Sequence, residues 1–130
     1  MTIKMKKDLD FKYWFNKASA LVRLKKYEEA IECFDKAIEL NPNLYLLWYF
    51  KGKSLVRLTR YEESINCFNK ASILAPDNFR ILFAIGEIYY QLKQYDKAME
   101  YVTKAKELNS TDSNLLMFIE KINEARKNKF

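Results

Sequence analysis

The sequence contains no histidine, only two cysteines and only two glycines. Without histidine, the commonest general base and the commonest transition-metal ligand in proteins are both missing. Two cysteines cannot by themselves complete a four-ligand zinc site. The two glycines lie 34 positions apart, so neither of the phosphate-binding patterns GxxxxGK and GxGxxG can be written with them. These absences predict a protein that is not an enzyme and that needs no metal and no cofactor.

A long hydrophobic run is also missing. The longest one, residues 44–50, is far shorter than the roughly 18 residues needed to span a bilayer. Residues 1–10 include three lysines but no hydrophobic stretch typical of a signal peptide. We therefore expect a cytoplasmic protein without membrane contact. Cys33 and Cys67 lie 34 residues apart, at what would be equivalent positions of adjacent repeats. Stacked helices would hold them about 8–10 Å apart, beyond the roughly 7 Å Cα limit for a disulfide, so we expect reduced, partly buried thiols.

The rare residues that are present recur at one fixed distance. Each of the following pairs is separated by 34 residues: Trp14 and Trp48, Cys33 and Cys67, Pro42 and Pro76, and Gly52 and Gly86. Four rare residue types in one register indicate an internal repeat of a single supersecondary unit. A unit of this size cannot bury its apolar face alone, so successive units must stack on one another. Stacked units offer a surface for other molecules more readily than a closed catalytic cleft.

The chain divides into three such units at residues 11–44, 45–78 and 79–112. Each reads as two amphipathic helices, the first helices covering 11–24, 45–58 and 79–92 and the second covering 25–40, 59–74 and 93–108. Asn43, Asp77 and Thr111 are expected N-caps of the helices that follow them. Within each unit, Glu28, Glu62 and Asp96 are expected to begin the second helix, where acidic residues favour the helix dipole.

Two terminal segments lie outside these units. Residues 113–130 carry one apolar stripe (Leu115, Leu116, Ile119 and Ile122), which predicts a seventh helix that caps the end of the stack. Residues 1–10 form an N-terminal extension. It could either drape over the first unit or remain disordered.

Aligning the units from Phe11, Tyr45 and Phe79 gives numbered positions at which large and small apolar residues alternate. Position four holds Trp14, Trp48 and Leu82; position eight Ala18, Gly52 and Gly86; position twenty Ala30, Ser64 and Ala98; position twenty-four Phe34, Phe68 and Val102; position twenty-seven Ala37, Ala71 and Ala105. Together with Pro42 and Pro76 at position thirty-two, this pattern resembles the tetratricopeptide repeat family. The departures are Lys17 and Lys51 at position seven, Leu21 and Leu55 at position eleven, and Ser110 in place of the third proline.

The resemblance implies an all-α, right-handed superhelical solenoid of three helix-turn-helix repeats with a C-terminal capping helix. Such proteins line a concave groove with their first helices, at positions two, five, nine, twelve and thirteen. Seven basic residues and one acid lie on the first helices, against nine basic and ten acidic residues on the second helices. The peptide-binding residues expected from this comparison are Lys12, Phe15, Arg23, Tyr49, Phe50, Lys53, Arg57, Arg80, Phe83, Glu87 and Tyr90.

The sequence therefore predicts a non-catalytic adaptor that binds an acidic peptide or helix with apolar anchors in a basic, aromatic-lined groove. An alternative is a self-assembling structural module, because Phe11, Tyr13 and Ala20 have no preceding unit to cover them and a homodimer could form there. Single-stranded nucleic acid is a less favoured partner, since the balanced second helices dilute the positive field.

One subtype of the family is argued against. Members that hold the C-terminal carboxylate of heat-shock chaperones use lysine, asparagine and arginine at five positions. The corresponding residues here are Phe15, Ser19, Phe50, Arg80 and Ala84. Only Arg80 fits that pattern, so a two-carboxylate clamp is not expected.

Overall fold

The computed structural model describes residues 2–128, and all regular structure in this range is α-helix, in seven segments. The expected all-α chain of seven helices is confirmed. The helices group into two compact units, which differ from the 34-residue repeats of the sequence. Unit 1 is Met1–Leu74 and unit 2 is Ala75–Phe130, and we describe them separately.

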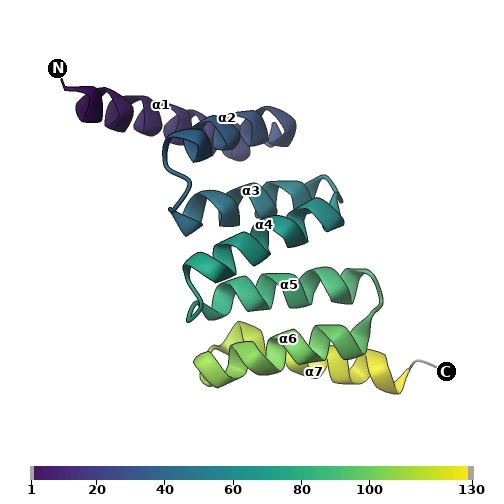
Figure 1. Cartoon of the computed structure of the whole chain (residues 1–130). Coiled ribbons are helices and arrows are strands. Elements are labelled where there is room, and N and C mark those ends of the chain that lie inside the picture. The colour runs from purple at the N-terminus through teal and green to yellow at the C-terminus, as the bar shows by residue number, and fades with distance from the viewer. Residues whose placement is uncertain (1, 129–130) are drawn as a thin grey trace. The chain divides into compact units, whose positions relative to one another are not determined.

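Unit 1 contains four helices that form two helical hairpins. They are α1 (Ile3–Arg23), α2 (Tyr27–Leu40), α3 (Tyr45–Arg57) and α4 (Tyr61–Leu74). Each helix packs against the next one along the chain (Figure 1). In the core, Ala18 of α1 packs in one cluster with Ala30, Phe34 and Ala37 of α2. Because the alanines have no bulk beyond Cβ, the helices approach closely and the ring fills the remaining space.

Unit 2 contains one hairpin and a third helix that covers it. The hairpin is α5 (Phe79–Gln91) and α6 (Tyr95–Leu108), and α7 (Ser113–Lys127) packs on α6 (Figure 1). Leu115 and Ile122 of α7 are fully buried in a core with Val102 and Ala105 of α6. The tail therefore buries an apolar stripe, as its sequence predicted.

The two glycines mark close contacts between the paired helices. A Cβ atom added to Gly52 would lie 2.9 Å from Cε1 of Phe68, and one added to Gly86 would lie 2.7 Å from Cγ1 of Val102. Real Cβ atoms do not approach carbon atoms this closely, since optimal carbon contacts lie near 3.5–4.0 Å. An alanine at either position would therefore force the neighbouring side chain to shift. Neither glycine has a positive φ angle.

The turns inside the repeats use residues that the sequence did not single out. Lys25, Thr59 and Lys93 occupy the left-handed region, with φ angles of 61°, 58° and 60°. After α1, the N–H of Lys26 donates to the carbonyl of Leu21 at 2.8 Å. The same i to i−5 bond recurs at Arg60 and Gln94, so each first helix ends in a Schellman motif with a non-glycine residue at its centre.

Helix starts differ from the expected ones by one residue. The second helices begin at Tyr27, Tyr61 and Tyr95 rather than at the acidic residues after them. Asn43, Asp77 and Thr111 are not N-caps; the caps are Leu44, Asn78 and Asp112. The Asn78 side chain accepts from the N–H of Arg80 at 3.0 Å, and that of Asp112 from the N–H of Leu115 at 2.9 Å. The tight turn after each second helix occupies the expected cap position, which moves the extended cap residue one place on.

The N-terminal segment adopts neither of the two expected states. Residues 3–10 are the first turns of α1, and Thr2 caps this helix by accepting from the N–H of Met5 at 3.1 Å. These turns project beyond the end of α2 (Figure 1). The expectation was wrong because a segment without a clear apolar stripe can still continue a helix that packing already stabilises further along.

Among residues 2–128, no helix combines the length and apolar character that crossing a membrane requires.

Candidate protein-binding surfaces

The helices α1 and α3 carry the unit 1 residues that the sequence singled out. We call this set the unit 1 surface: Lys12, Phe15 and Arg23 on α1, and Tyr49, Phe50, Lys53 and Arg57 on α3. Tyr49, Lys53 and Arg57 follow one another at a spacing of four, which places them on one face of α3. The four basic side chains are exposed, and the three aromatic ones are partly buried.

The aromatic residues of the unit 1 surface are held in place by the core beneath them. The ring of Phe50 lies 6.2 Å from Phe15 of α1 and 6.2 Å from the buried Phe34 of α2, measured between centroids. Tyr49 contacts the buried Phe68 of α4 edge-on at 5.6 Å. Rings fixed in this way can offer apolar contact area to a partner at little cost in side-chain entropy.

Two of the cations are positioned by aromatic rings. The ammonium of Lys53 lies 5.8 Å from the centroid of Tyr49. The guanidinium of Arg57 lies 5.5 Å from the centroid of Tyr27 on α2, and its Nε donates to the Tyr27 hydroxyl at 3.2 Å. The sequence missed the part played by Tyr27, because this residue lies 30 positions away on a second helix. Charge is thereby held at a defined place without being neutralised.

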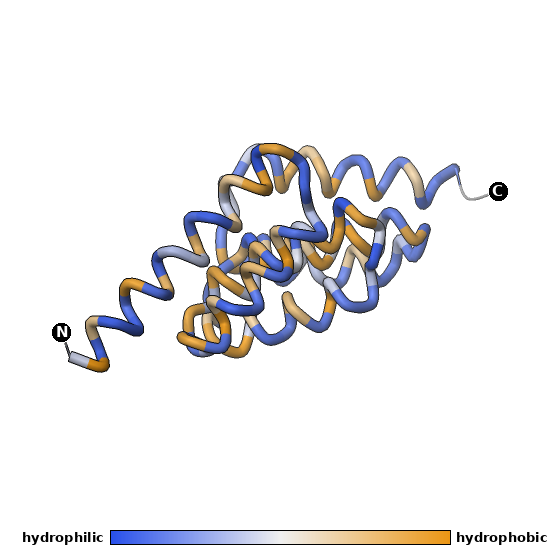
Figure 2. Tube along the Cα trace, turned by 90° about the horizontal axis from the view of Figure 1, so that it is seen from above, coloured by the Kyte–Doolittle hydropathy of each residue, from blue (hydrophilic) through white to orange (hydrophobic). Residues whose placement is uncertain are grey.

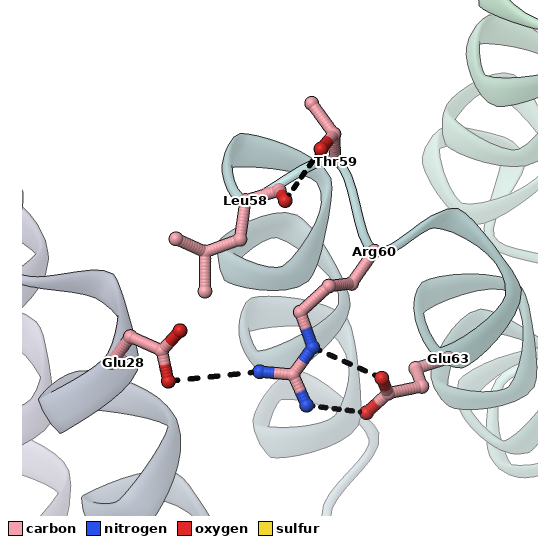
Figure 3. Close-up of polar contacts among 5 residues, drawn as sticks. All are labelled: Glu28, Leu58, Thr59, Arg60 and Glu63. Carbon is pink, nitrogen blue, oxygen red and sulfur yellow. Dashed lines mark hydrogen bonds and ion pairs between the residues drawn. The ribbon is translucent and has the colours of Figure 1, made fainter.

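Two other cations of unit 1, Arg60 in the turn before α4 and Lys51 of α3, form ion pairs with acidic residues. In Figure 3, Arg60 forms two parallel hydrogen bonds with Glu63, at 3.0 and 2.7 Å, and also reaches Glu28 of α2 at 3.8 Å. The hydrogen bonds from Arg60 lower the pKa of the Glu63 carboxyl. Lys51 of α3 is drawn toward the same side by an ion pair with Asp35 at 2.6 Å. These two cations are therefore paired with acids, whereas Lys53 and Arg57 lie over aromatic rings.

In unit 2, the helix α5 carries Arg80, Phe83, Glu87 and Tyr90, which we call the unit 2 surface. Its two aromatic rings are engaged by the capping helix. Phe118 of α7 lies 5.5 Å from Phe83 and 5.3 Å from Tyr90. The ammonium of Lys121 lies 5.1 Å from the centroid of Tyr90. The cap therefore takes up part of the apolar area that the sequence assigned to a ligand.

The sequence analysis assigned no residue of α7 to a ligand surface, although the 34-residue alignment could have done so. If the 34-residue alignment is continued, Ser113 becomes position one of a fourth unit. Met117 then falls at position five and Lys121 at position nine, two of the positions expected to face a ligand. Met117 is two-thirds exposed.

The residues expected to support self-association lie on different sides of α1. Phe11 packs against the unit 1 core and stacks on Phe15 at 6.0 Å. Tyr13 is half-exposed and Ala20 is partly exposed. Helical spacing places Tyr13 and Ala20 away from the core side that carries Phe11 and Trp14.

Both thiols are buried and free, as the sequence predicted. Burial raises the pKa of Cys33, and it raises that of Cys67 to about 11. A thiol with such a pKa is almost wholly protonated near neutral pH and is a poor nucleophile. Within residues 2–128, no three side chains of the metal-binding types cluster.

Sequence comparison assigns most of the chain to one family. Profiles described as "Tetratricopeptide repeat" match residues 11–44 and residues 49–113. The chain belongs to the tetratricopeptide repeat family. No curated protein sequence matches it.

Several known structures share this fold. The first such domain of Spaghetti (RPAP3), bound to the HSP90 peptide SRMEEVD, is 19% identical with a TM-score of 0.84, covering 92% of this chain and 94% of that one. The second domain of human RPAP3, in complex with the HSP70 peptide SGPTIEEVD, is 18% identical with a TM-score of 0.82, covering 90% and 98%. MamA from Desulfovibrio magneticus is 24% identical with a TM-score of 0.82, covering 90% and 66%. At these identities the likeness establishes the all-α repeat solenoid fold.

The lysines at position seven of the tetratricopeptide repeats replace the leucine that the family pattern asks for. Their ammonium groups lie over the position-four tryptophans, Lys17 at 5.5 Å from Trp14 and Lys51 at 6.0 Å from Trp48. A second lysine approaches each ring from the following helix, Lys36 at 5.3 Å and Lys70 at 5.8 Å. The lysine stems cover apolar area while their charged ends remain accessible to water, so the departure preserves the packing.

Proposed function

We propose that this tetratricopeptide repeat chain is a non-catalytic protein-interaction module that binds an acidic peptide segment with apolar side chains. The unit 1 surface supplies the principal contacts. One observation carries the proposal: on unit 1, exposed cations lie beside aromatic rings that the core holds fixed. Apolar side chains of a ligand would pack on Phe15, Tyr49 and Phe50, and the cations would attract and orient its acidic residues.

The ligands of two related structures are consistent with this chemistry. The peptides SRMEEVD and SGPTIEEVD, bound to the RPAP3 domains, both combine acidic residues with an apolar side chain. The carboxylate-clamp residues expected for such C-terminal peptides are absent here, apart from Arg80. We therefore propose an internal acidic segment as the ligand, recognised without its terminal carboxylate. The unit 2 surface contributes less, because Phe118 occupies part of its aromatic area.

The test is a binding screen at fixed ionic strength with two probes, an acidic peptide library and poly-U RNA. We expect enriched peptides that contain acidic and aromatic or aliphatic residues, with dissociation constants on the order of micromolar. Affinity should fall as salt rises, because exposed charges are screened over about 8–10 Å. The variant Tyr49→Ala should lose binding, since it removes one fixed ring.

Lys106→Glu is the matched control for charge reversals, because Lys106 is exposed on α6, a helix that carries no residue of either surface. It should leave peptide binding unchanged. Binding of RNA without enrichment of any peptide would replace this proposal with a single-strand nucleic-acid site. Failure of both probes would reject a ligand-binding role for the unit 1 surface.

A further inference from the structure

Two exposed cations of α3 lie on one face of the helix. Lys53 and Arg57 are four residues apart, a spacing that brings side chains next to each other and at which like charges destabilise a helix. Among residues 2–128 neither forms an ion pair, whereas Lys51 of the same helix is paired with Asp35. Hydrophilic residues recur along the helices (Figure 2), so exposure alone marks no site. The adjacent like charges set this place apart.

The 34-residue pattern does not require this pair of cations. They occupy positions nine and thirteen of the repeat. The equivalent residues are Ser19 and Arg23 in α1, Glu87 and Gln91 in α5, and Lys121 and Ala125 in α7. Two cations together at these positions are therefore a feature of α3. An arrangement that costs helix stability and serves no repeated packing need is typical of a functional site, where a ligand offsets the repulsion.

Aromatic side chains hold both cations in place. The ammonium of Lys53 lies 5.8 Å from the centroid of Tyr49, and the guanidinium of Arg57 lies 5.5 Å from that of Tyr27. The Nε of Arg57 donates to the Tyr27 hydroxyl at 3.2 Å, so the two terminal nitrogens of the guanidinium remain as donors for a ligand. Because the Tyr27 hydroxyl accepts this bond, it can still donate its own proton. The side chains together offer an anion an ammonium, two guanidinium nitrogens and a hydroxyl.

This donor set matches a doubly charged anion better than a carboxylate. A carboxylate has one negative charge and two oxygens, so it would neutralise one of the two cations and leave the other. A phosphorylated side chain carries a charge of about −1.5 to −2 at pH 7 and three acceptor oxygens. Its oxygens can also accept two parallel hydrogen bonds from one guanidinium. The charge and the number of donors therefore favour a phosphate group.

We propose that Tyr27, Lys53 and Arg57 form a phosphate site that binds a phosphoserine of the ligand peptide. This inference rests on the proposed function, because the acidic segment bound by the unit 1 surface carries the phosphate. The acid that follows Tyr27 in the sequence does not oppose it, since Glu28 is directed toward Arg60 at 3.8 Å. Phosphorylation of the ligand would then strengthen its binding.

Competition among three peptide sets tests the phosphate site on the full chain. Each set has degenerate positions drawn from Asp, Glu, Leu and Phe around one fixed residue, which is phosphoserine, glutamate or serine. At fixed ionic strength and about pH 7.5, we expect the phosphoserine set to bind about tenfold more tightly than the glutamate set, because it gains charge-assisted hydrogen bonds. The serine set should bind more weakly than both.

Three variants separate the phosphate site from general attraction. Tyr27→Phe keeps the ring beside Arg57 and removes only the hydroxyl, so it should reduce the preference for phosphoserine over glutamate to about threefold. Lys53→Met keeps an apolar stem and removes one charge, so it should abolish the preference. Lys12→Met is the matched control, because Lys12 is an exposed cation of the unit 1 surface on α1. It should weaken both sets equally and preserve their ratio.

A change of pH isolates the second charge of the phosphate. The second pKa of a phosphoserine is about 6, so about a quarter of the free peptide remains dianionic at about pH 5.5. The preference over the glutamate set should therefore fall from about tenfold to about threefold. The chain has no histidine, the side chain that ordinarily titrates in this interval. The glutamate set is the control for any other effect of pH on binding.

The outcomes distinguish the phosphate site from the proposed function. Equal affinity of the phosphoserine and glutamate sets would overturn the phosphate site and leave acidic peptide binding intact. Equal loss of the preference in Lys12→Met and Lys53→Met would also overturn it, because the preference would then come from the charge of the whole surface. If none of the three sets binds, the proposed function and the phosphate site are both wrong.

Discussion

Unit 1 and unit 2 are built from the same 34-residue repeat but expose different surfaces to solvent. Residues 1–74 contain 14 basic and 9 acidic side chains, whereas residues 75–130 contain 9 and 8. In unit 1 the position-five and position-six rings lie on the core and remain partly exposed. In unit 2 the corresponding ring of Phe83 contacts Phe118 of the capping helix.

The difference shows that two requirements compete for the same side chains. A helix that closes the end of a stack needs apolar partners, and it takes up ring area that would otherwise be available to a ligand. Unit 2 therefore gains buried area at Leu115 and Ile122, while unit 1 retains exposed rings and an excess of positive charge. The following experiments compare unit 2, whose apolar residues mainly bury the capping helix, with unit 1, whose exposed residues we propose to bind a ligand.

Removing residues 113–130 should have the largest effect. The truncation uncovers Val102 and Ala105 and removes two fully buried side chains, Leu115 and Ile122, each worth about 2–5 kcal/mol when truncated. Both tryptophans lie in unit 1, so tryptophan fluorescence reports that unit. We expect the truncated chain to lose helical ellipticity at a lower temperature while the fluorescence transition remains near its original position.

If the chain without residues 113–130 aggregates, a point variant can replace it in this test. Ile122→Ala should lower the free energy of unfolding of unit 2 by about 2–5 kcal/mol. Met117→Ala, on the exposed side of the same helix, should change it little. Fluorescence and ellipticity transitions that shift together in Ile122→Ala would show that the two units unfold as one body.

A smaller effect is expected at the two close helix contacts. Gly86→Ala places a Cβ 2.7 Å from Val102, and Gly52→Ala places one 2.9 Å from the Phe68 ring. Overpacking of this kind costs about 1–3 kcal/mol, partly offset by alanine's better helix propensity of about 1 kcal/mol. Urea unfolding followed by ellipticity should show destabilisation of both variants. Gly86→Ala should cost less stability in a Val102→Ala background than in the parent chain, and strictly additive losses would contradict the contact.

The regular parts of this fold were predictable because most buried positions recur in every 34-residue repeat. The seven helices, the free buried thiols and the cap of α7 follow from repeated small and large apolar residues. The left-handed turn residues Lys25, Thr59 and Lys93 were not predictable from residue type, because backbone hydrogen bonds hold a conformation that usually favours glycine. The helical state of residues 3–10 was missed for a related reason, since it is propagated from the packed part of α1.

The candidate surfaces were predictable only in part. Spacing alone identified the residues of α1, α3 and α5 that share a face. It could not show that Tyr27 positions Arg57, or that Phe118 contacts Phe83 and Tyr90, because these pairs join different helices. A single sequence therefore predicts which residues share one face of a helix, but it does not predict which residues of different helices are in contact.

Charge reversal compares the two surfaces directly. Arg57→Glu should weaken binding of an acidic peptide about tenfold, a change of about 1.4 kcal/mol, mainly through slower association. Arg80→Glu should weaken it only about twofold, because the unit 2 surface is less basic and partly covered by α7. Stopped-flow association rates at low and high salt would measure both, with Lys106→Glu as the control. Equal losses in the two variants would mean that the ligand uses both surfaces alike.

The smallest expected effect is a pH dependence of the free energy of unfolding. It should be seen in unit 1, because both cysteines lie there. Burial raises the pKa of Cys67 from 9.0 to about 11, so the folded state holds this proton more tightly than the unfolded state does. The resulting stability is fully present below pH 9 and is lost as pH rises from 9 to 11, with about 1 kcal/mol lost by pH 10. Urea unfolding of unit 1, followed by tryptophan fluorescence at pH 8 and pH 10, should show this loss. Lysines and tyrosines also titrate there, so the measurement is the difference from Cys67→Ala, which should lose about 1 kcal/mol less over the same interval. If the parent and the variant lose the same stability, the Cys67 thiol titrates normally in the folded state.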